Sequence, residues 1–224
     1  MNKILILTAN IGKKDNLKDQ VNIFPNCDYI ALVDSPQNVN NWVQTKFFNF
    51  SSIDNYKNRR NSKLYKTLSS WIFNQYEYIV WIDGTQHLIY NPQELINKHG
   101  EFDYLLFKHN DRNCLYDEID IVKKLYLDSI NILNQQQQYY KSQNMPPDYG
   151  LYEMGFHIKK VNEKTMNLDL MWFEQISKFS SRDQISFPFC LWKMKDEIKV
   201  KYVGEYEGIS HRRQNYVLEQ PHNY

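Results

Sequence analysis

The chain has 224 residues, 42% hydrophobic and 24% charged, a composition typical of a single folded globular protein. Its 27 Lys and Arg residues nearly balance 26 Asp and Glu residues, which gives a formal net charge of +1. That balance excludes a global positive field for nucleic acid or an anionic membrane, so a bound anion must be held by a local cluster. Three separated cysteines indicate reduced thiols, and no run reaches the roughly 20 apolar residues of a membrane span. We therefore expect a cytoplasmic protein without a transmembrane segment or a nucleic-acid partner.

Strands dominate the predicted N-terminal region. Residues 4–7 form a short apolar run that predicts a buried strand, and a polar loop containing Gly12 follows it. Residues 29–33 repeat the pattern and end in Asp34. Residues 46–50 are a candidate third strand.

The strongest single signal is a buried strand that ends in a carboxylate. Residues 58–74 have apolar side chains at helical spacing, and the apolar run 78–82 then ends in Asp83-Gly84-Thr85. Glycine at this point predicts an unusual backbone conformation. Ligands of open α/β sheets bind where strands end, so Asp83 is a candidate functional residue. The alternative interpretation is an Asp-Gly turn that only caps the strand.

The remaining elements complete an alternating pattern. We predict helices at 91–96, 115–138, 165–179 and 183–193, the last capped by Ser180 or Ser181, and strands at 102–107, 155–158 and 198–203. The glutamine run at 135–138 is interpreted as a solvated helix end, and 142–149 as a loop. Strands that alternate with helices predict an α/β fold with a mostly parallel central sheet, in one domain over residues 1–224.

A basic cluster lies on the predicted helix just before Asp83. Arg59 and Lys63, and separately Lys63 and Lys66, share a helix face at three- or four-residue spacing. Like charges repel there, so the arrangement costs stability unless an anion such as phosphate is present. A solvated basic face is the ordinary alternative.

Three further groups are candidates for chemistry. Lys108, His109 and Arg112 follow a strand and could bind anions or sugar hydroxyls, although a charged connection explains them equally well. Asp183 lies in the first turn of a helix, where the helix dipole stabilises a negative charge, and this is the ordinary explanation for an acid there. Together with the neighbouring Gln184 it could also bind hydroxyl groups or act as a base. His211 lies among late cations, and a lone histidine is more often structural.

Together these blocks resemble the glycosyltransferase-like domain first described in plant proteins of the TOD and MUCI type, and the match covers most of the chain in the same order. The matching residues are Thr8-Ala9, Gly12, Lys63, Lys66, Trp81-Ile82-Asp83-Gly84, Lys108, His109, Arg112, Tyr116, Glu118, Gly150-Leu151-Tyr152-Glu153 and the block from Trp172 through Glu174 to Gln184. One departure is Asn113, which stands where the family commonly has Asp and weakens any catalytic role for that position.

The resemblance implies a GT-A-like fold in which a nucleotide sugar lies across the carboxyl edge of the sheet. The positions expected to contact this donor are Thr8, Ala9, Asn10, Arg59, Lys63, Lys66, Asp83, Gly84, Lys108, His109 and Arg112. Such enzymes generally hold a divalent metal with an Asp-x-Asp motif, but the second carboxylate is replaced here by Thr85. Asp83 with His211 could hold Mn²⁺ or Mg²⁺ together with phosphate oxygens and water. Alternatively, the Arg and Lys cluster neutralises the diphosphate without metal.

The implied activity is transfer of a sugar from a nucleotide-sugar donor to a hydroxyl acceptor such as a glycan. Asp183 and Gln184 would orient the transferred sugar or the acceptor. If the reaction inverts, Asp183 is the expected general base and Glu153 the reserve. The incomplete Asp-x-Asp also allows a non-catalytic glycan- or nucleotide-binding module. A third possibility is a metal-dependent hydrolase that uses Asp83, Asp183 and His211.

Overall fold

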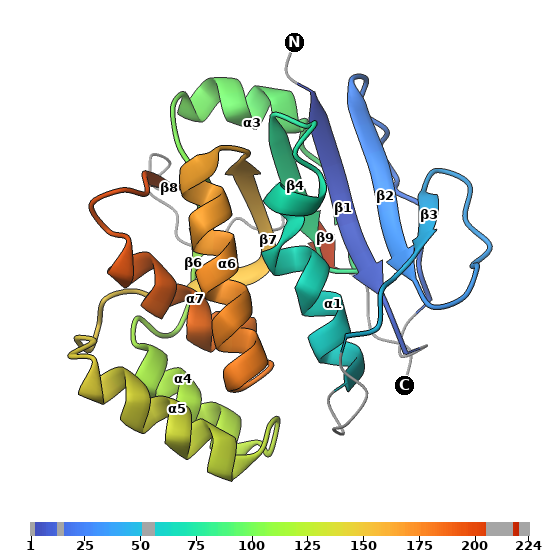
Figure 1. The fold of residues 1–224 in the computed structure, drawn as a ribbon. Coiled ribbons are helices and arrows are strands. Elements are labelled where there is room, and N and C mark those ends of the chain that lie inside the picture. Colours follow the sequence, from blue (N-terminus) through green and yellow to red (C-terminus); the bar gives the residue numbers. More distant parts are fainter. Residues whose placement is uncertain (1–2, 13–15, 51–56, 205–216, 220–224) are drawn as a thin grey trace.

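A seven-stranded sheet forms the centre of the computed structural model, which describes residues 3–12, 16–50, 57–204 and 217–219 (Figure 1). Its strand order is β3-β2-β1-β4-β7-β6-β8. The bounds are β1 Ile4–Asn10, β2 Cys27–Val33, β3 Val43–Lys46, β4 Tyr78–Ile82, β6 Tyr104–Lys108, β7 Tyr152–Lys160 and β8 Val200–Tyr202. Only β7 runs antiparallel to its neighbours β4 and β6, and the other adjacent strands are parallel, which confirms the mostly parallel sheet. Outside it, β5 (Gln86–Leu88) pairs with β9 (Val217–Glu219).

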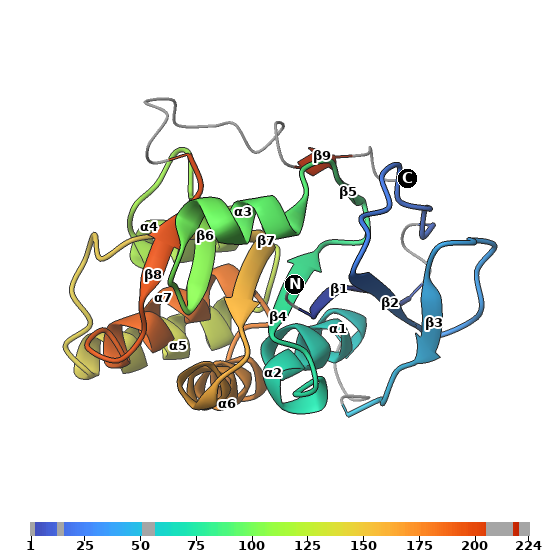
Figure 2. The ribbon, with the colours of Figure 1, turned by 90° about the horizontal axis from the view of Figure 1, so that it is seen from above.

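Helices cover both faces of this sheet. Figure 2 shows α1, α2, α6 and α7 on one face and α3 on the other, which confirms the predicted α/β arrangement. The helices are α1 Lys57–Thr67, α2 Ser69–Ile72, α3 Pro92–His99, α4 Leu115–Lys124, α5 Ile130–Ser142, α6 Glu163–Lys178 and α7 Asp183–Lys193. None of the helices within the described ranges is long and apolar enough to cross a bilayer.

The central strands are apolar on both sides because both faces of the sheet are covered. In β1, Ile4 and Ile6 join the core beneath α3, whereas Leu5 and Leu7 join the core beneath α1, and all four are buried. Side chains of a strand point alternately to opposite faces, so a continuous apolar run is what a doubly covered strand requires.

Two predicted helices are each divided in two. The helix expected at 58–74 breaks at Leu68 into α1 and α2, and that expected at 115–138 breaks after Lys124 into α4 and α5. The interpretation of residues 135–138 as a solvated helix end was wrong in part: Gln135 and Gln138 are exposed, but the run is not a helix end. They lie within α5, and Gln136 is fully buried and donates to the Tyr140 hydroxyl at 2.8 Å.

Two smaller predictions also need correction. The third strand spans Val43–Lys46 rather than 46–50, and Phe48 is exposed. Arg182, not a serine, is the N-cap of α7, and no side chain caps this helix. The Ser180 and Ser181 hydroxyls instead donate to Asp128 Oδ2, at 2.8 and 2.9 Å.

Candidate active site at the carboxyl edge of the sheet

Asp83 follows β4 directly and presents a half-exposed carboxylate at the edge of the sheet. Its Oδ1 atom accepts a hydrogen bond from Trp81 Nε1 at 2.9 Å and lies 3.5 Å from the Lys66 ammonium. Its Oδ2 atom receives no hydrogen bond from the residues that the structure describes, and its side chain is 45% exposed. The carboxylate is therefore oriented through one oxygen while the other can accept a ligand.

Lys63 and Lys66 of α1 converge on Asp183 at the start of α7. Asp183 Oδ2 lies 2.8 Å from Lys63 Nζ and 2.5 Å from Lys66 Nζ. The Lys66 side chain is only 1% exposed, so its charge is enclosed by protein. The like-charge repulsion expected of the two lysines is therefore offset within the chain by Asp83 and Asp183, without a phosphate.

This cluster shifts the pKa values of its members. Burial raises the pKa of Asp183, but the ammonium groups of Lys63 and Lys66 outweigh it and hold the pKa well below its usual range. Burial lowers the pKa of Lys63 to about 8, although Asp183 opposes the change. Burial also lowers the pKa of Lys66, but Asp183 and Asp83 outweigh it and raise the pKa overall. Asp183 is thus ionised and a weak proton acceptor.

Unpartnered polar atoms lie at the carboxyl ends of β1 and β2, and those of β1 are close to Gly84. The position of a Cβ atom on Gly84 would be 3.6 Å from the Ala9 carbonyl oxygen and 3.8 Å from Thr8 Oγ1. Thr8 Oγ1, Asn10 Nδ2 and Asp34 Oδ1 are buried and have no hydrogen-bond partner among the described residues. Buried polar groups are normally satisfied, so these three atoms need a ligand or water.

Asp34 belongs to this edge, but no role was predicted for it from the sequence. Its Oδ2 atom accepts the Gly12 N–H at 2.9 Å, which ties the loop after β1 to the end of β2. The signal was present, because Asp34 ends an apolar strand as Asp83 does. The unusual backbone expected of Gly84 is not observed: the positive-φ glycines of the described chain are Gly12, Gly100, Gly150 and Gly204.

The block after β6 forms its own polar network. The backbone N–H groups of Asp111 and Arg112 donate to His109 Nδ1, at 3.1 and 3.2 Å, and Arg112 pairs with the buried Glu118 at 2.8 Å. Burial, aided by Arg112, lowers the pKa of His109. Lys108 is exposed, with its ammonium 4.4 Å from the centre of the Tyr202 ring. The parallel course of β4 and β6 places this block at the same edge as Asp83.

Other predicted site residues take different places. Arg59 donates to the Leu127 carbonyl at 2.8 Å, beside the turn between α4 and α5. Gln184 is half-buried next to Asp183 in α7, and Glu153 is half-buried in β7 opposite Phe107. His211 lies outside the described residues, so its part in a metal site stays a prediction.

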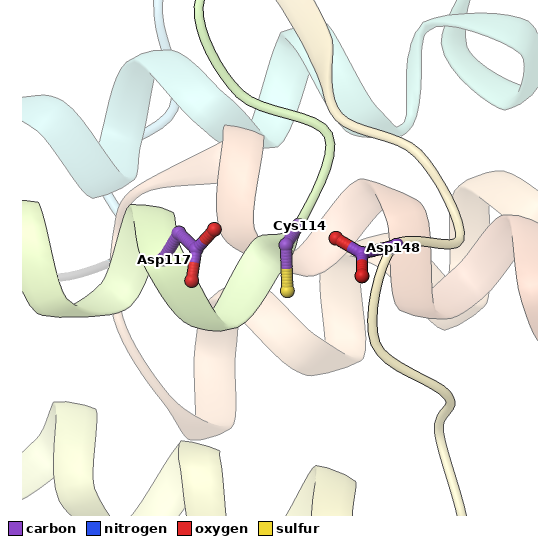
Figure 3. Close-up of side chains that lie close together, drawn as sticks. All are labelled: Cys114, Asp117 and Asp148. Carbon is purple, nitrogen blue, oxygen red and sulfur yellow. The ribbon is translucent and has the colours of Figure 1, made fainter.

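A second group of potential metal ligands lies at the start of α4. The Cys114 thiol and the carboxylates of Asp117 and Asp148 are within 4.8 Å of one another (Figure 3). Both acids are exposed, and exposed acids commonly gather without an ion. The geometry alone therefore does not define a metal site there.

Comparisons with known proteins agree with this architecture. The chain is 25% identical over 177 residues to the probable hexosyltransferase MUCI70 of Arabidopsis thaliana, and the match covers 73% of this chain but 30% of the plant protein. The WbbM bifunctional glycosyltransferase matches 90% of this chain with a TM-score of 0.50 and 12% identity, over 39% of its own length. The mannosyltransferase Ktr4p of S. cerevisiae matches 90% of this chain with the same TM-score and identity, over 68% of its length.

The structural neighbours establish that the fold is GT-A-like, as the resemblance implied. The family itself is established by sequence. The TOD1/MUCI70 glycosyltransferase-like domain matches residues 34–214, which include the Asp83 strand, the block after β6 and the start of α7. The chain therefore belongs to the TOD1/MUCI70 family of glycosyltransferase-like domains.

Proposed function

We propose that this chain is a glycosyltransferase that moves a hexose or related sugar from a nucleotide-sugar donor to a hydroxyl of a glycan or glycoconjugate. One observation carries the proposal: Asp83 presents an open oxygen at the carboxyl edge, and the neighbouring Gly84 lies against Thr8 and Asn10 of β1, which carry buried polar atoms without a partner among the described residues. A nucleotide offers the hydrogen-bonding groups that such atoms lack. Family membership and the plant hexosyltransferase relative support the same activity.

The charge balance of the site favours a divalent cation. A diphosphate needs positive charge, but Lys63 and Lys66 are already balanced by Asp83 and Asp183. Asp83 offers a half-exposed oxygen, which suits a hard cation such as Mn²⁺ or Mg²⁺ whose other ligands are phosphate oxygens and water. Such an ion, when bound, would neutralise the diphosphate leaving group.

The protein groups then have distinct roles in this proposal. Lys66, enclosed by protein, orients Asp83 and Asp183, whereas Lys63 is the less buried of the two lysines and can approach the donor. Asp183 stays ionised, so it serves with Gln184 to orient sugar hydroxyls rather than to remove a proton. Glu153 remains the candidate if the reaction needs a general base.

The test is release of nucleoside diphosphate from a panel of UDP- and GDP-sugars, with and without Mn²⁺. We expect turnover with at least one donor, dependence on the metal, and a loss of about a hundredfold or more in Asp83→Asn. Absence of both binding and turnover for every donor would refute the proposal. Binding without turnover, unchanged in Asp83→Asn, would indicate a non-catalytic module, which the replacement of the second carboxylate by Thr85 allows. Donor hydrolysis that outpaces transfer to every acceptor would indicate a hydrolase.

A further inference from the structure

The turn between α4 and α5 exposes an apolar surface that the proposed donor site does not use. Leu125, Tyr126 and Ile130 are 57%, 77% and 42% exposed, and together they are called the α4–α5 tip. Scattered exposed apolar side chains are ordinary on a protein surface. Here three of them lie within six residues, at one turn between two helices.

Tyr126 has a backbone conformation that disfavours its side chain. Its φ is 52°, in the left-handed region, where the residue that follows a helix is usually glycine. The turn closes by hydrogen bonds from Tyr126 N to Lys123 O and from Leu127 N to Val122 O, at 3.1 and 3.0 Å. A tyrosine here costs stability that glycine would not. Strain of this kind at an exposed aromatic residue points to a role in binding.

The α4–α5 tip is also held firmly by the elements that build the active site. The Leu127 carbonyl accepts from Arg59 of α1 at 2.8 Å. The buried Asp128 carboxylate accepts from the Ser181 N–H at 3.0 Å and from the Ser180 hydroxyl at 2.8 Å, just before Asp183. A rigid, exposed aromatic surface loses little conformational entropy when it binds a ligand.

A row of basic side chains along α1 connects this surface to Asp83. Lys66 lies beside Asp83, Lys63 beside Asp183, and Arg59 beside Leu127, so the row ends at the tip. The seven residue steps from Arg59 to Lys66 span about 10 Å of helix. Figure 1 shows α4 and α5 on the side toward which β1 and β2 run, which is the side of the proposed donor site.

We propose that the α4–α5 tip is an acceptor-binding surface, on which the Tyr126 ring stacks against a sugar ring of a glycan acceptor. A pyranose ring has an apolar face of C–H groups and a rim of hydroxyls, which suits an exposed aromatic ring in a turn that also exposes the aliphatic side chains of Leu125 and Ile130. This inference rests on the proposed glycosyltransferase function and specifies where its acceptor binds.

The test compares Tyr126→Gly with Tyr126→Phe. Glycine removes the ring but suits the positive φ, so the variant should fold at least as well as the wild type, whereas phenylalanine keeps the ring. Binding of neutral gluco-, manno-, xylo- and galacto-oligosaccharides is measured by saturation-transfer NMR, and binding of UDP and GDP with Mn²⁺ is measured separately by calorimetry. We expect an oligosaccharide signal in the wild type and Tyr126→Phe, and a loss of about tenfold in affinity in Tyr126→Gly, with nucleotide binding and melting temperature preserved.

The outcomes separate this inference from the proposed function. Equal oligosaccharide binding by wild type and Tyr126→Gly would overturn the acceptor surface, as would nucleotide binding by a wild type that binds none of the oligosaccharides. A dimeric wild type that Tyr126→Gly converts to a monomer would also overturn it, because the tip would then be a subunit interface. Ring-dependent oligosaccharide binding without any nucleotide binding would support the surface and refute the transferase.

Discussion

Lys63 is the lysine of the active-site pair that a ligand can reach, because its side chain is 13% exposed and that of Lys66 only 1%. Its pKa of about 8 places its loss of charge just above neutral pH. Only the protonated ammonium attracts a diphosphate, so nucleotide affinity should fall by roughly tenfold as pH rises from about 7 to about 9. Calorimetric titration with UDP or GDP and Mg²⁺ measures this. Lys63→Arg keeps its charge and should flatten the profile; an unchanged profile would contradict the assignment.

The Asp183 carboxylate should also contribute strongly to the stability of the folded protein. Asp183→Asn leaves Lys66 buried with its closest carboxylate removed, so unfolding free energy at pH 7 should fall by about 3–5 kcal/mol. Asp120→Asn is the matched control, because its pair with Lys123 is on the surface and should be worth about 1 kcal/mol or less. Urea unfolding at several pH values measures both.

The pH dependence of that difference has a definite sign. The pKa of Asp183 is lowered in the folded protein, so its stabilisation is complete above the unfolded pKa of about 4 and is lost as pH falls through the lower folded value. The difference between wild type and Asp183→Asn should therefore be constant from neutral pH down to about pH 5, and it should shrink only in stronger acid. A difference that disappears above pH 5 would show that the carboxylate is not held by the two lysines.

At the scale of elements, a buried ion pair fixes the break between α1 and α2. The fully buried Lys159 of β7 lies 2.7 Å from both oxygens of Asp169 of α6. Lys159 Nζ also donates to the carbonyls of Lys66 and Thr67, at 3.3 Å each, and Asp169 accepts the Ser70 N–H at 3.1 Å. The network thus satisfies backbone groups freed where α1 ends, and it holds the residue that orients Asp83.

Removing one partner of this ion pair should lower the free energy of unfolding more than removing both partners. Lys159→Met leaves a buried carboxylate uncompensated and should cost about 3–5 kcal/mol of unfolding free energy. The double variant Lys159→Met with Asp169→Leu removes both charges and should be more stable than Lys159→Met alone. Urea unfolding of the two single variants and the double variant gives the coupling energy. Additive losses would show that the two groups act independently.

How far the sequence predicted these elements depends on the range of the contacts involved. The apolar runs of β1, β2 and β4 were found because burial on both faces makes them continuous. The single helix expected at 115–138 was wrong because periodicity does not reveal a left-handed residue such as Tyr126. The buried glutamine of α5 was missed because its partner Ser180 comes from a distant segment.

For the candidate site, the sequence indicated individual residues but not the contacts between them. Asp83, Lys63, Lys66 and Asp183 were each singled out, and the resemblance placed them in one site, but sequence did not reveal that the lysines bind the acids. Arg59 was expected at the donor, yet it donates to the turn between α4 and α5. The Lys159–Asp169 pair had no local signal, because two buried charges ten residues apart resemble ordinary surface residues in the sequence.

At the scale of the whole molecule, the topology collects residues from distant parts of the chain at one edge. The strands β1, β4 and β6 run in the same direction, so the segments that follow them, at Asn10, Asp83 and Lys108, meet at the carboxyl edge. The α3 helix lies toward the opposite end of the molecule, at the top of Figure 1. A bound nucleotide should therefore protect backbone amides mainly at the end of the molecule that holds the carboxyl edge of the sheet.

Hydrogen exchange with and without a bound nucleoside diphosphate tests that arrangement. With saturating UDP or GDP and Mn²⁺, amides in segments 8–12, 57–67 and 83–86 should exchange more slowly, because ligand contacts add to the free energy of local opening. Peptides from α3, at 92–99, are the internal control and should be unchanged unless binding stabilises the whole chain equally. Protection centred on α3 while the nucleotide is bound would place the donor elsewhere. Protection limited to the carboxyl edge, and weakened in Asp83→Asn, is what a donor held across the ends of β1 and β4 requires.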